Sequence, residues 1–144
     1  RNGGLCTEQD YPYVSGTTQK AGTCQTSCKE VPGSKVVSWT DLAATDAPLT
    51  GALNQQPVSV AVQADQDAFM LYAGGIVTGY CGTNLDHGVL AVGYGTDNGI
   101  DFYKVKNSWG TSWGEGGFIR IQRNVNQEGG QCGILSAASF PTIE

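Results

Sequence analysis

Two stretches decide the fold of this chain: NLDHGVLAVGYG at residues 84–95 and YKVKNSWGTSWG at residues 103–114. The first is a mostly apolar run that contains His87, the only histidine, and the second alternates apolar and polar residues before Asn107. Residues 95–99, GTDNG, lie between them and contain an Asn-Gly turn signal. Because such a turn between two strand-like runs is typical of a β-hairpin, we predict an antiparallel hairpin here.

This hairpin would bring the histidine to an asparagine. Folding the chain about Asp97 sets His87 and Asn107 opposite each other within a residue or two, where facing Cβ atoms lie about 4.5–5.5 Å apart. An asparagine oxygen that accepts one imidazole N–H fixes the tautomer and leaves the other ring nitrogen for a nucleophile. The pair is therefore two parts of a Cys/His/Asn nucleophilic site. A half-buried histidine bonded to a convenient amide is the alternative.

The segment that follows the asparagine differs from an ordinary hairpin end. NSWGTSWGEGG at residues 107–117 is rich in glycine, which permits tight turns, and contains two tryptophans. An indole laid over a His/Asn hydrogen bond would exclude water and strengthen the bond. We predict that Trp109 is this cover and that Trp113 anchors the core.

Composition excludes several classes of protein. Of the 144 residues 40% are hydrophobic and 15% charged, which is typical of a globular chain and not of a disordered one. A net charge of −5, without a basic cluster, argues against nucleic acid as a partner. The apolar stretches are too short to cross a bilayer, so no membrane partner is expected. With one histidine and no CxxC, we expect no metal site and no cofactor.

Five cysteines favour an oxidising compartment and disulfides. Their pairing has several solutions, and one thiol must lack a partner within the chain. A bridge from Cys81 to Cys132 would close a loop of about fifty residues, worth about 4 kcal/mol, and would clamp the segment that bears His87.

The chain changes character near residues 32–34. Residues 1 to 34 are polar and full of turn signals, so this part must pack on something larger. Beyond residue 36 we expect strands at 58–63, 87–94, 102–106 and 118–123, and short helices at 46–54 and 67–72, with Asp46 as the cap of the first.

At this point the residues resemble the papain-like cysteine proteases of the cathepsin L-like and plant papain-like type. DHGVLAVGYG at 86–95 and VKNSWG at 105–110 are similar to the His and Asn signatures of that family. Similar text occurs at NGGL (2–5), YPY (11–13), QPVSV (56–60), GEGGFIR (114–120) and CGILSAASFP (132–141). The resemblance implies an α+β, papain-like fold.

By this likeness the chain is the C-terminal two-thirds of a mature enzyme. Residues 1–34 would be the closing loops of the helical left domain, and residues 35–144 would be the antiparallel β-barrel right domain with short helices. The family's nucleophilic Cys and oxyanion-hole Gln have no counterpart here, so we expect them in a segment before Arg1, and we expect the chain alone to be inactive.

The resemblance also implies roles for single residues. His87 would form a thiolate/imidazolium pair with the Cys and later protonate the leaving amine, while Asn107 orients it. Trp109 would cover their hydrogen bond, and Asp86 would either favour the protonated ring or simply cap the loop end. The pocket for the second residue before the scissile bond would be formed by Ala61, Leu85, Gly88 and Ala137. These are small or apolar, so Leu, Val or Phe should be preferred there.

The cysteines are assigned on the same likeness. Cys81 and Cys132 resemble the barrel-domain bridge, Cys24 resembles a half-cystine whose partner lies in the missing segment, and a bridge between Cys6 and Cys28 is our hypothesis.

The expected function is a cysteine endopeptidase of the lysosome, vacuole or secreted space. Expected partners are a peptide or protein substrate and the N-terminal segment of the same enzyme, whether in the same chain or a separate one. By family likeness, a propeptide or cystatin-like inhibitors are also expected. A catalytically silent binding or scaffold relative is the alternative, and a disulfide-rich adhesion module would explain the cysteines but not the His/Asn pair.

Overall fold

The computed structural model describes residues 3–144 and has a mixed α+β fold dominated by one sheet. The chain divides into two compact units. One comprises Arg1–Trp39 with Pro141–Glu144, and the other comprises Thr40–Phe140. The predicted catalytic pair lies in the second unit.

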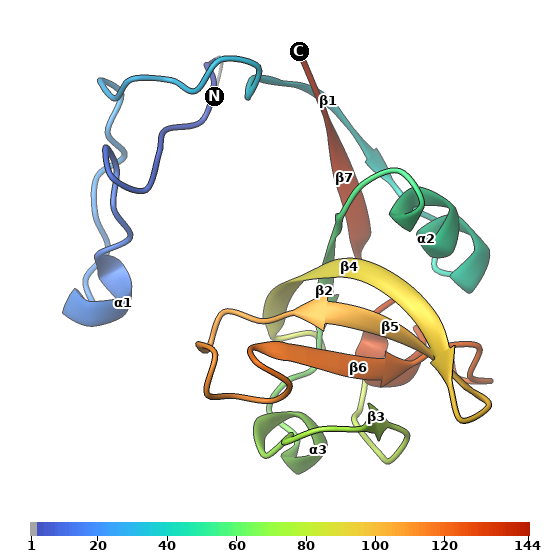
Figure 1. The fold of residues 1–144 in the computed structure, drawn as a ribbon. Helices are drawn as coiled ribbons and strands as arrows, with labels where there is room; N and C mark the ends of the chain where they lie inside the picture. Colours follow the sequence, from blue (N-terminus) through green and yellow to red (C-terminus); the bar gives the residue numbers. More distant parts are fainter. Residues whose placement is uncertain (1–2) are drawn as a thin grey trace. The chain divides into compact units, whose positions relative to one another are not determined.

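The strands among the described residues belong to a single sheet (Figure 1). They are β1 (Val36–Asp41), β2 (Val58–Val62), β3 (Ile76–Val77), β4 (His87–Asp97), β5 (Ile100–Lys106), β6 (Phe118–Gln122) and β7 (Ala138–Ile143). Their order is β1-β7-β2-β4-β5-β6-β3, with β1 and β3 at the edges. The expected barrel is therefore not closed by hydrogen bonds. It is also not wholly antiparallel, because the two-residue β3 runs parallel to β6.

The helices in the described part of the chain are short. They are α1 (Ser15–Thr18), α2 (Asp46–Leu53), α3 (Asp67–Met70) and the 3-10 turn η1 (Gln131–Gly133). None of them is long and apolar enough to span a membrane. The expected helices near 46–54 and 67–72 are confirmed. The prediction that Asp46 is the N-cap of the first helix was wrong. Thr45 stands at the N-cap position of α2, and Asp46 instead accepts hydrogen bonds from the Tyr103 hydroxyl (2.5 Å) and the Asn124 N–H (3.2 Å).

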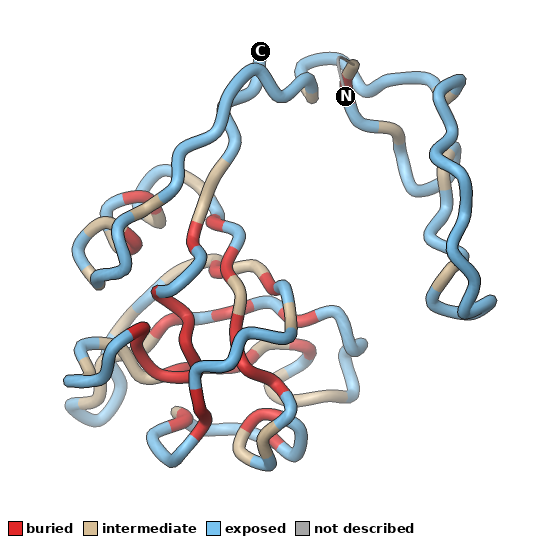
Figure 2. The backbone as a smooth tube through the Cα atoms, turned by 180° about the vertical axis from the view of Figure 1, so that it is seen from behind, coloured by how far each residue is buried: buried red, intermediate tan, exposed pale blue. Residues whose placement is uncertain are grey.

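The core lies on one face of the sheet. Alternation along β2 buries Val58, Val60 and Val62 and turns the side chains between them outward. Burial of each such side chain contributes about 1.5–3 kcal/mol. Leu49 of α2 packs against this core, and Phe69 of α3 is fully buried in it. Figure 2 shows the buried positions concentrated in the unit of residues 40–140.

The predicted hairpin is confirmed as β4–β5. Asn98 and Gly99 have φ of 50° and 78°, the left-handed values that an Asn-Gly turn needs. Tyr94 pairs with Tyr103 near the turn, and Leu90 pairs with Lys106 further along. A β-bulge between Ala91 and Gly93 shifts the register by one residue.

The first unit contains little buried surface. Within residues 3–34, Gly4 alone is buried. A disulfide joins Cys6 to Cys28, and a β-bridge joins Cys6 to Glu30. This agrees with the expectation that residues 1–34 cannot form a core by themselves.

Candidate active site

The site is built where β4 begins and β5 ends. His87 opens β4, and its backbone is level with Val62 of β2 in the antiparallel ladder. Asn107 follows β5 and is held by its own N–H, which donates to Gly117 O at 3.0 Å. The imidazole Nε2 and Asn107 Oδ1 are 2.8 Å apart. The histidine and asparagine that are twenty residues apart in sequence thus form a direct side-chain hydrogen bond.

A neighbouring backbone amide fixes the direction of this bond. Ser108 N–H donates to Asn107 Oδ1 at 2.8 Å, so that amide atom must be the oxygen. The oxygen can only accept, so the proton lies on His87 Nε2. In the neutral ring, Nδ1 is therefore the unprotonated nitrogen. This is the tautomer that a histidine needs if its second nitrogen is to act on a nucleophile.

Aromatic side chains surround the histidine ring. Trp109 stacks on His87 with ring centroids 5.2 Å apart and planes inclined by 28°. Phe69 meets both rings edge-on, at 6.1 Å from His87 and 5.5 Å from Trp109. Trp113 packs on Phe69 at 5.3 Å. The buried phenyl ring therefore supports the indole that lies on the histidine.

Asp86 anchors the approach to β4. Its carboxylate accepts the N–H groups of Ala64 at 2.7 Å and Asp65 at 3.2 Å, and its own N–H donates to Val62 O at 3.1 Å. These contacts fit the loop-end role considered above. They connect the residue before His87 to the segment that follows β2.

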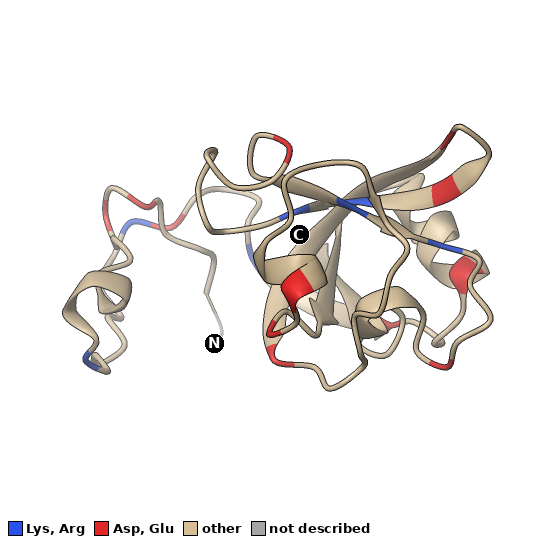
Figure 3. Ribbon diagram, turned by 90° about the horizontal axis from the view of Figure 1, so that it is seen from below, with Lys and Arg blue, Asp and Glu red and all other residues tan. Residues whose placement is uncertain are grey.

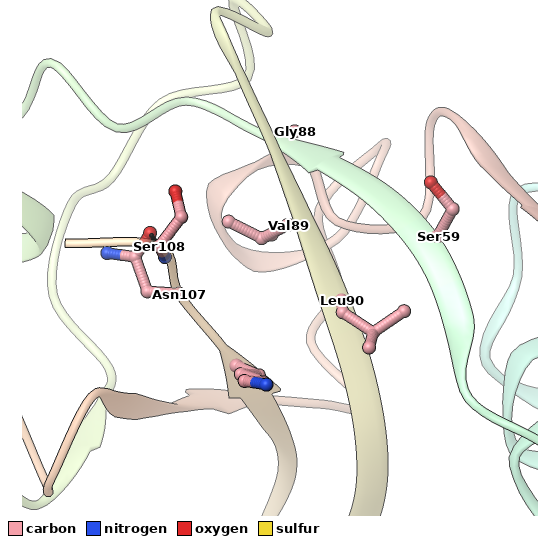
Figure 4. Close-up of a pocket in the computed structure, with 7 residues that line it drawn as sticks. Ser59, Gly88, Val89, Leu90, Asn107 and Ser108 are labelled. Atoms are coloured by element: carbon pink, nitrogen blue, oxygen red, sulfur yellow. Dashed lines mark hydrogen bonds between the residues drawn. The ribbon is translucent and has the colours of Figure 1, made fainter. Parts of the chain in front are cut away.

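Two shallow cavities adjoin the pair. One lies against His87 and Trp109 and is also lined by Ala64, Asp65, Met70 and Asp86. The other is lined by Asn107 and lies between β2, β4 and the end of β5 (Figure 4). In that view Asn107 and Ser108 stand on one side of β4, and Ser59 stands on the other.

Three of the four predicted pocket residues are backbone neighbours. Ala61 is level with Gly88 in the β2–β4 ladder, and its N–H donates to Ala137 O at 3.2 Å. These three are thus backbone neighbours, with Ala61 and Gly88 on paired strands and Ala137 just before β7. Leu85 lies against Gly133, where an added Cβ would meet its side chain. Gly88 and Ala137 line separate cavities.

The cysteines are arranged as two disulfides and one thiol. Bonds join Cys81 to Cys132 and Cys6 to Cys28, the pairs described above, and Cys24 is exposed and free. Both sulfurs of the Cys81–Cys132 bond are buried, and the bond encloses β4, β5 and β6 within a separation of 51 residues. No group of residues among 3–144 has the composition of a metal site.

An ion-pair network ties the glycine-rich segment to the sheet. Arg120 of β6 binds Glu115 through Nη2 at 2.7 Å and Asp97 through Nη1 at 2.8 Å. Glu115 also accepts the Gly75 N–H at 3.0 Å, and its bonds from Arg120 hold the pKa of its carboxyl below the usual range. Figure 3 shows basic residues interspersed with acidic ones along the described chain.

Sequence reasoning missed two buried residues that lie outside the hairpin, Phe69 and Gln63. Phe69 comes from α3, and Gln63 follows β2 with only 4% of its surface exposed. Bonds from Gln63 and then Gln66 lower the pKa of Asp65. The run VQADQDAF at 62–69 contains one signal that could have pointed to Gln63 as a buried polar residue. This signal is a Gln directly after a strand of alternating valines.

A family model described as papain family cysteine protease matches residues 1–142. The chain therefore belongs to the papain family of cysteine proteases, as the sequence resemblance indicated. It is 49% identical to cysteine proteinase COT44 of Brassica napus over 142 residues, which cover 98% of this chain and 42% of that protein. It is 46% identical to oryzain beta chain of Oryza sativa subsp. japonica over 143 residues, 99% of this chain and 30% of that one.

Solved structures show the same fold. The bromelain protease from Ananas comosus in complex with the E64 inhibitor matches with a TM-score of 0.89 at 37% identity, over 99% of this chain and 65% of that one. The proform of the ragweed pollen protease Amb a 11 matches with a TM-score of 0.88 at 37% identity. The match covers 100% of this chain and 43% of that one. The papain-like α+β fold is thus confirmed. The chain spans less than half the length of the two curated relatives named above.

Proposed function

We propose that the protein is a cysteine endopeptidase in which His87 is the acid–base residue and Asn107 orients it. The observation that carries this proposal is the 2.8 Å bond from His87 Nε2 to Asn107 Oδ1, whose direction Ser108 fixes. That bond leaves His87 Nδ1 to take the proton of a thiol.

The nucleophilic Cys and an oxyanion-binding Gln would come from a part of the natural protein outside residues 1–144, so the chain alone would be inactive. The thiol passes its proton to His87, and the thiolate attacks the scissile carbonyl carbon. The imidazolium then protonates the departing amine as the C–N bond breaks, leaving a thioester. Water, deprotonated by the neutral ring, attacks the thioester and releases the acid and the thiol.

Trp109 and Asp86 have supporting roles in this proposal. Trp109 keeps water from the His87–Asn107 bond, which is stronger in a less polar setting. Asp86 holds the residue before His87 through the N–H groups of Ala64 and Asp65.

Substrates would be peptides or proteins with an apolar second residue before the scissile bond. Ala61, Leu85, Gly88 and Ala137 bring no charge to the proposed pocket, so it offers nothing to pair with an arginine. Dipeptide substrates with Leu, Val or Phe at that position should be cut faster than one with Arg. Faster cleavage of the substrate with Arg at that position would contradict this assignment.

The resemblance to papain-like proteases also supports proposals on the domain organisation, the inhibitors and the compartment of the protein. Residues 1–34 would complete a helical domain and residues 35–144 form the His- and Asn-bearing domain, while Cys24 would pair with a half-cystine outside the chain. A propeptide or cystatin-like protein would inhibit the enzyme. The two disulfides suit a vacuole, lysosome or secreted space.

The test uses the natural protein that carries residues 1–144. A thiol-directed epoxide should add one inhibitor mass to it, and His87→Ala should abolish both peptide cleavage and rapid labelling. Tyr80→Ala, at a side chain 81% exposed, is the matched control and should behave as the wild type. A folded protein that is neither labelled nor active would instead be the silent binding relative.

A further inference from the structure

Gln63 is a buried polar side chain that the proposed mechanism does not use. It follows β2 directly, and only 4% of its surface is exposed. Burying an amide is costly unless its oxygen and nitrogen are both hydrogen-bonded. An apolar side chain of similar volume would fill the same space without needing hydrogen bonds. The role of Gln63 is therefore to be found in the hydrogen bonds that its amide makes.

Both ends of the Gln63 amide are hydrogen-bonded. Oε1 accepts the backbone N–H of Asn84 at 2.7 Å, and Nε2 donates to Asp65 Oδ1 at 2.7 Å. Asp65 is itself fixed, since the same oxygen accepts from Gln66 Nε2 at 2.9 Å. The amide therefore joins the segment after β2 to the loop before β4.

The backbone around Gln63 is fixed as well. Its N–H donates to Cys132 O at 2.8 Å, which connects it to the buried Cys81–Cys132 bond. On its other side, Gly82 adopts φ of +74°, and a Cβ there would overlap the Gln63 amide. The loop that leaves Cys81 thus passes directly over this side chain.

The same loop carries the residues next to the histidine. Asn84 is bound by Gln63, and Asp86 is bound by the N–H groups of Ala64 and Asp65. Leu85 lies between these two anchors, and His87 follows them. The loop is therefore attached to residues 63–65 on both sides of Leu85 before β4 begins.

From these contacts we infer that Gln63 is a positioning residue that sets the place of the loop at residues 82–86, and through it the places of Leu85 and His87. This inference rests on the proposed function, since positioning matters to the rate only if His87 acts on substrate. Catalysis is sensitive to such placement, because a misplacement of about 1 Å can cost on the order of 10²-fold in rate.

The test compares three variants of the natural protein that carries this chain. Gln63→Met keeps the volume but removes both hydrogen bonds. Gln63→Glu keeps an oxygen for Asn84 N–H. Gln131→Met is the matched control, because Gln131 is also buried, at 5% exposed, and its amide donates to Gly79 O. Rates are expressed per site titrated with a thiol-directed epoxide, so that loss of folded protein does not count.

We expect Gln63→Met to lower kcat about tenfold while KM changes less than about threefold. Gln63→Glu should recover part of kcat, most at acidic pH, where a protonated carboxyl can again donate to Asp65. Asp65 and Asp86 are the charged groups beside it, and they disfavour a third carboxylate at higher pH. Gln131→Met should lower the melting temperature but leave kcat within twofold.

Amide exchange gives a readout that needs no activity. The Asn84 amide should exchange slowly in the wild type and at least tenfold faster in Gln63→Met, while Gln131→Met leaves it slow. Unchanged kcat and unchanged Asn84 exchange in Gln63→Met would overturn the inference, as would an equal loss of kcat in Gln131→Met. A wild type without turnover would refute the proposed function alone, and Asn84 exchange would still decide whether Gln63 holds the loop.

Discussion

Trp109 covers the histidine ring at a centroid distance of 5.2 Å, but the indole itself remains 40% exposed. One face of it meets His87, and Phe69 packs against it in a T-shaped arrangement with ring centroids 5.5 Å apart. The indole thus stacks on the His87 ring without being part of the core.

Removing this cover should weaken catalysis more than folding. Trp109→Ala should lower kcat about tenfold, because water can then compete for the His87–Asn107 bond. Trp109→Phe keeps an aromatic ring against His87 and should retain most of the rate. Steady-state kinetics per titrated site would measure this, and equal rates for the two variants would contradict the stacking argument.

Loss of the asparagine should be more severe. Asn107→Ala removes the acceptor that fixes the His87 tautomer, so kcat should fall by on the order of 10²-fold. Asn54→Ala is a matched control, because the Asn54 side chain accepts the Tyr94 hydroxyl at 2.9 Å, away from the pair. Comparable rates for the Asn107 and Asn54 variants would argue against an orienting role.

The two disulfides should differ in their contribution to stability. The loop-entropy relation assigns about 4 kcal/mol to the Cys81–Cys132 bond, with a separation of 51 residues, and about 3 kcal/mol to Cys6–Cys28, with a separation of 22. Because Cys81 and Cys132 are buried, mild reductant should open Cys6–Cys28 first. Timed alkylation followed by peptide mass mapping would give the order, and the reverse order would contradict this expectation.

Tyr103 makes the stability of the fold sensitive to alkaline pH. Burial raises the pKa of its hydroxyl, and the hydrogen bond to Asp46 raises it further. A raised pKa means that the folded state holds the proton more tightly. The associated stability is therefore complete below the unfolded value of about 10 and is lost as pH rises above it.

Denaturant unfolding between about pH 8 and pH 11 would measure this effect. The free energy of unfolding should fall more steeply above about pH 10 in the wild type than in Tyr103→Phe. At neutral pH the variant should be less stable by about 1.5–3 kcal/mol, since it lacks a hydrogen bond to a carboxylate. Parallel pH curves would show that Tyr103 does not control the alkaline loss.

The parts of the fold that local chemistry determines could be predicted from the sequence. The β4–β5 hairpin follows from the Asn98-Gly99 turn and from strand periodicity. The hairpin brings His87 and Asn107 near each other, but their side chains share a face only because of a bulge in β4. It could not be predicted that the sheet stays open, with β1 and β3 at its edges, because the pairing of distant strands depends on tertiary contacts. Gln63 was missed for the same reason, since its partner Asn84 is distant in sequence.

The bulge was missed because Val92, the residue left out of the pairing, looks like any other apolar strand residue. With it, the register brings Asn107 level with Val89, two positions from His87 and on the same face of the hairpin. Without it, Asn107 would come level with Leu90, and its side chain would point to the other face. The unpaired residue thus decides whether the His87 and Asn107 side chains lie on the same face of the hairpin. Deleting a single residue within the paired part of either strand should therefore separate the histidine from its asparagine, even if the sheet still folds.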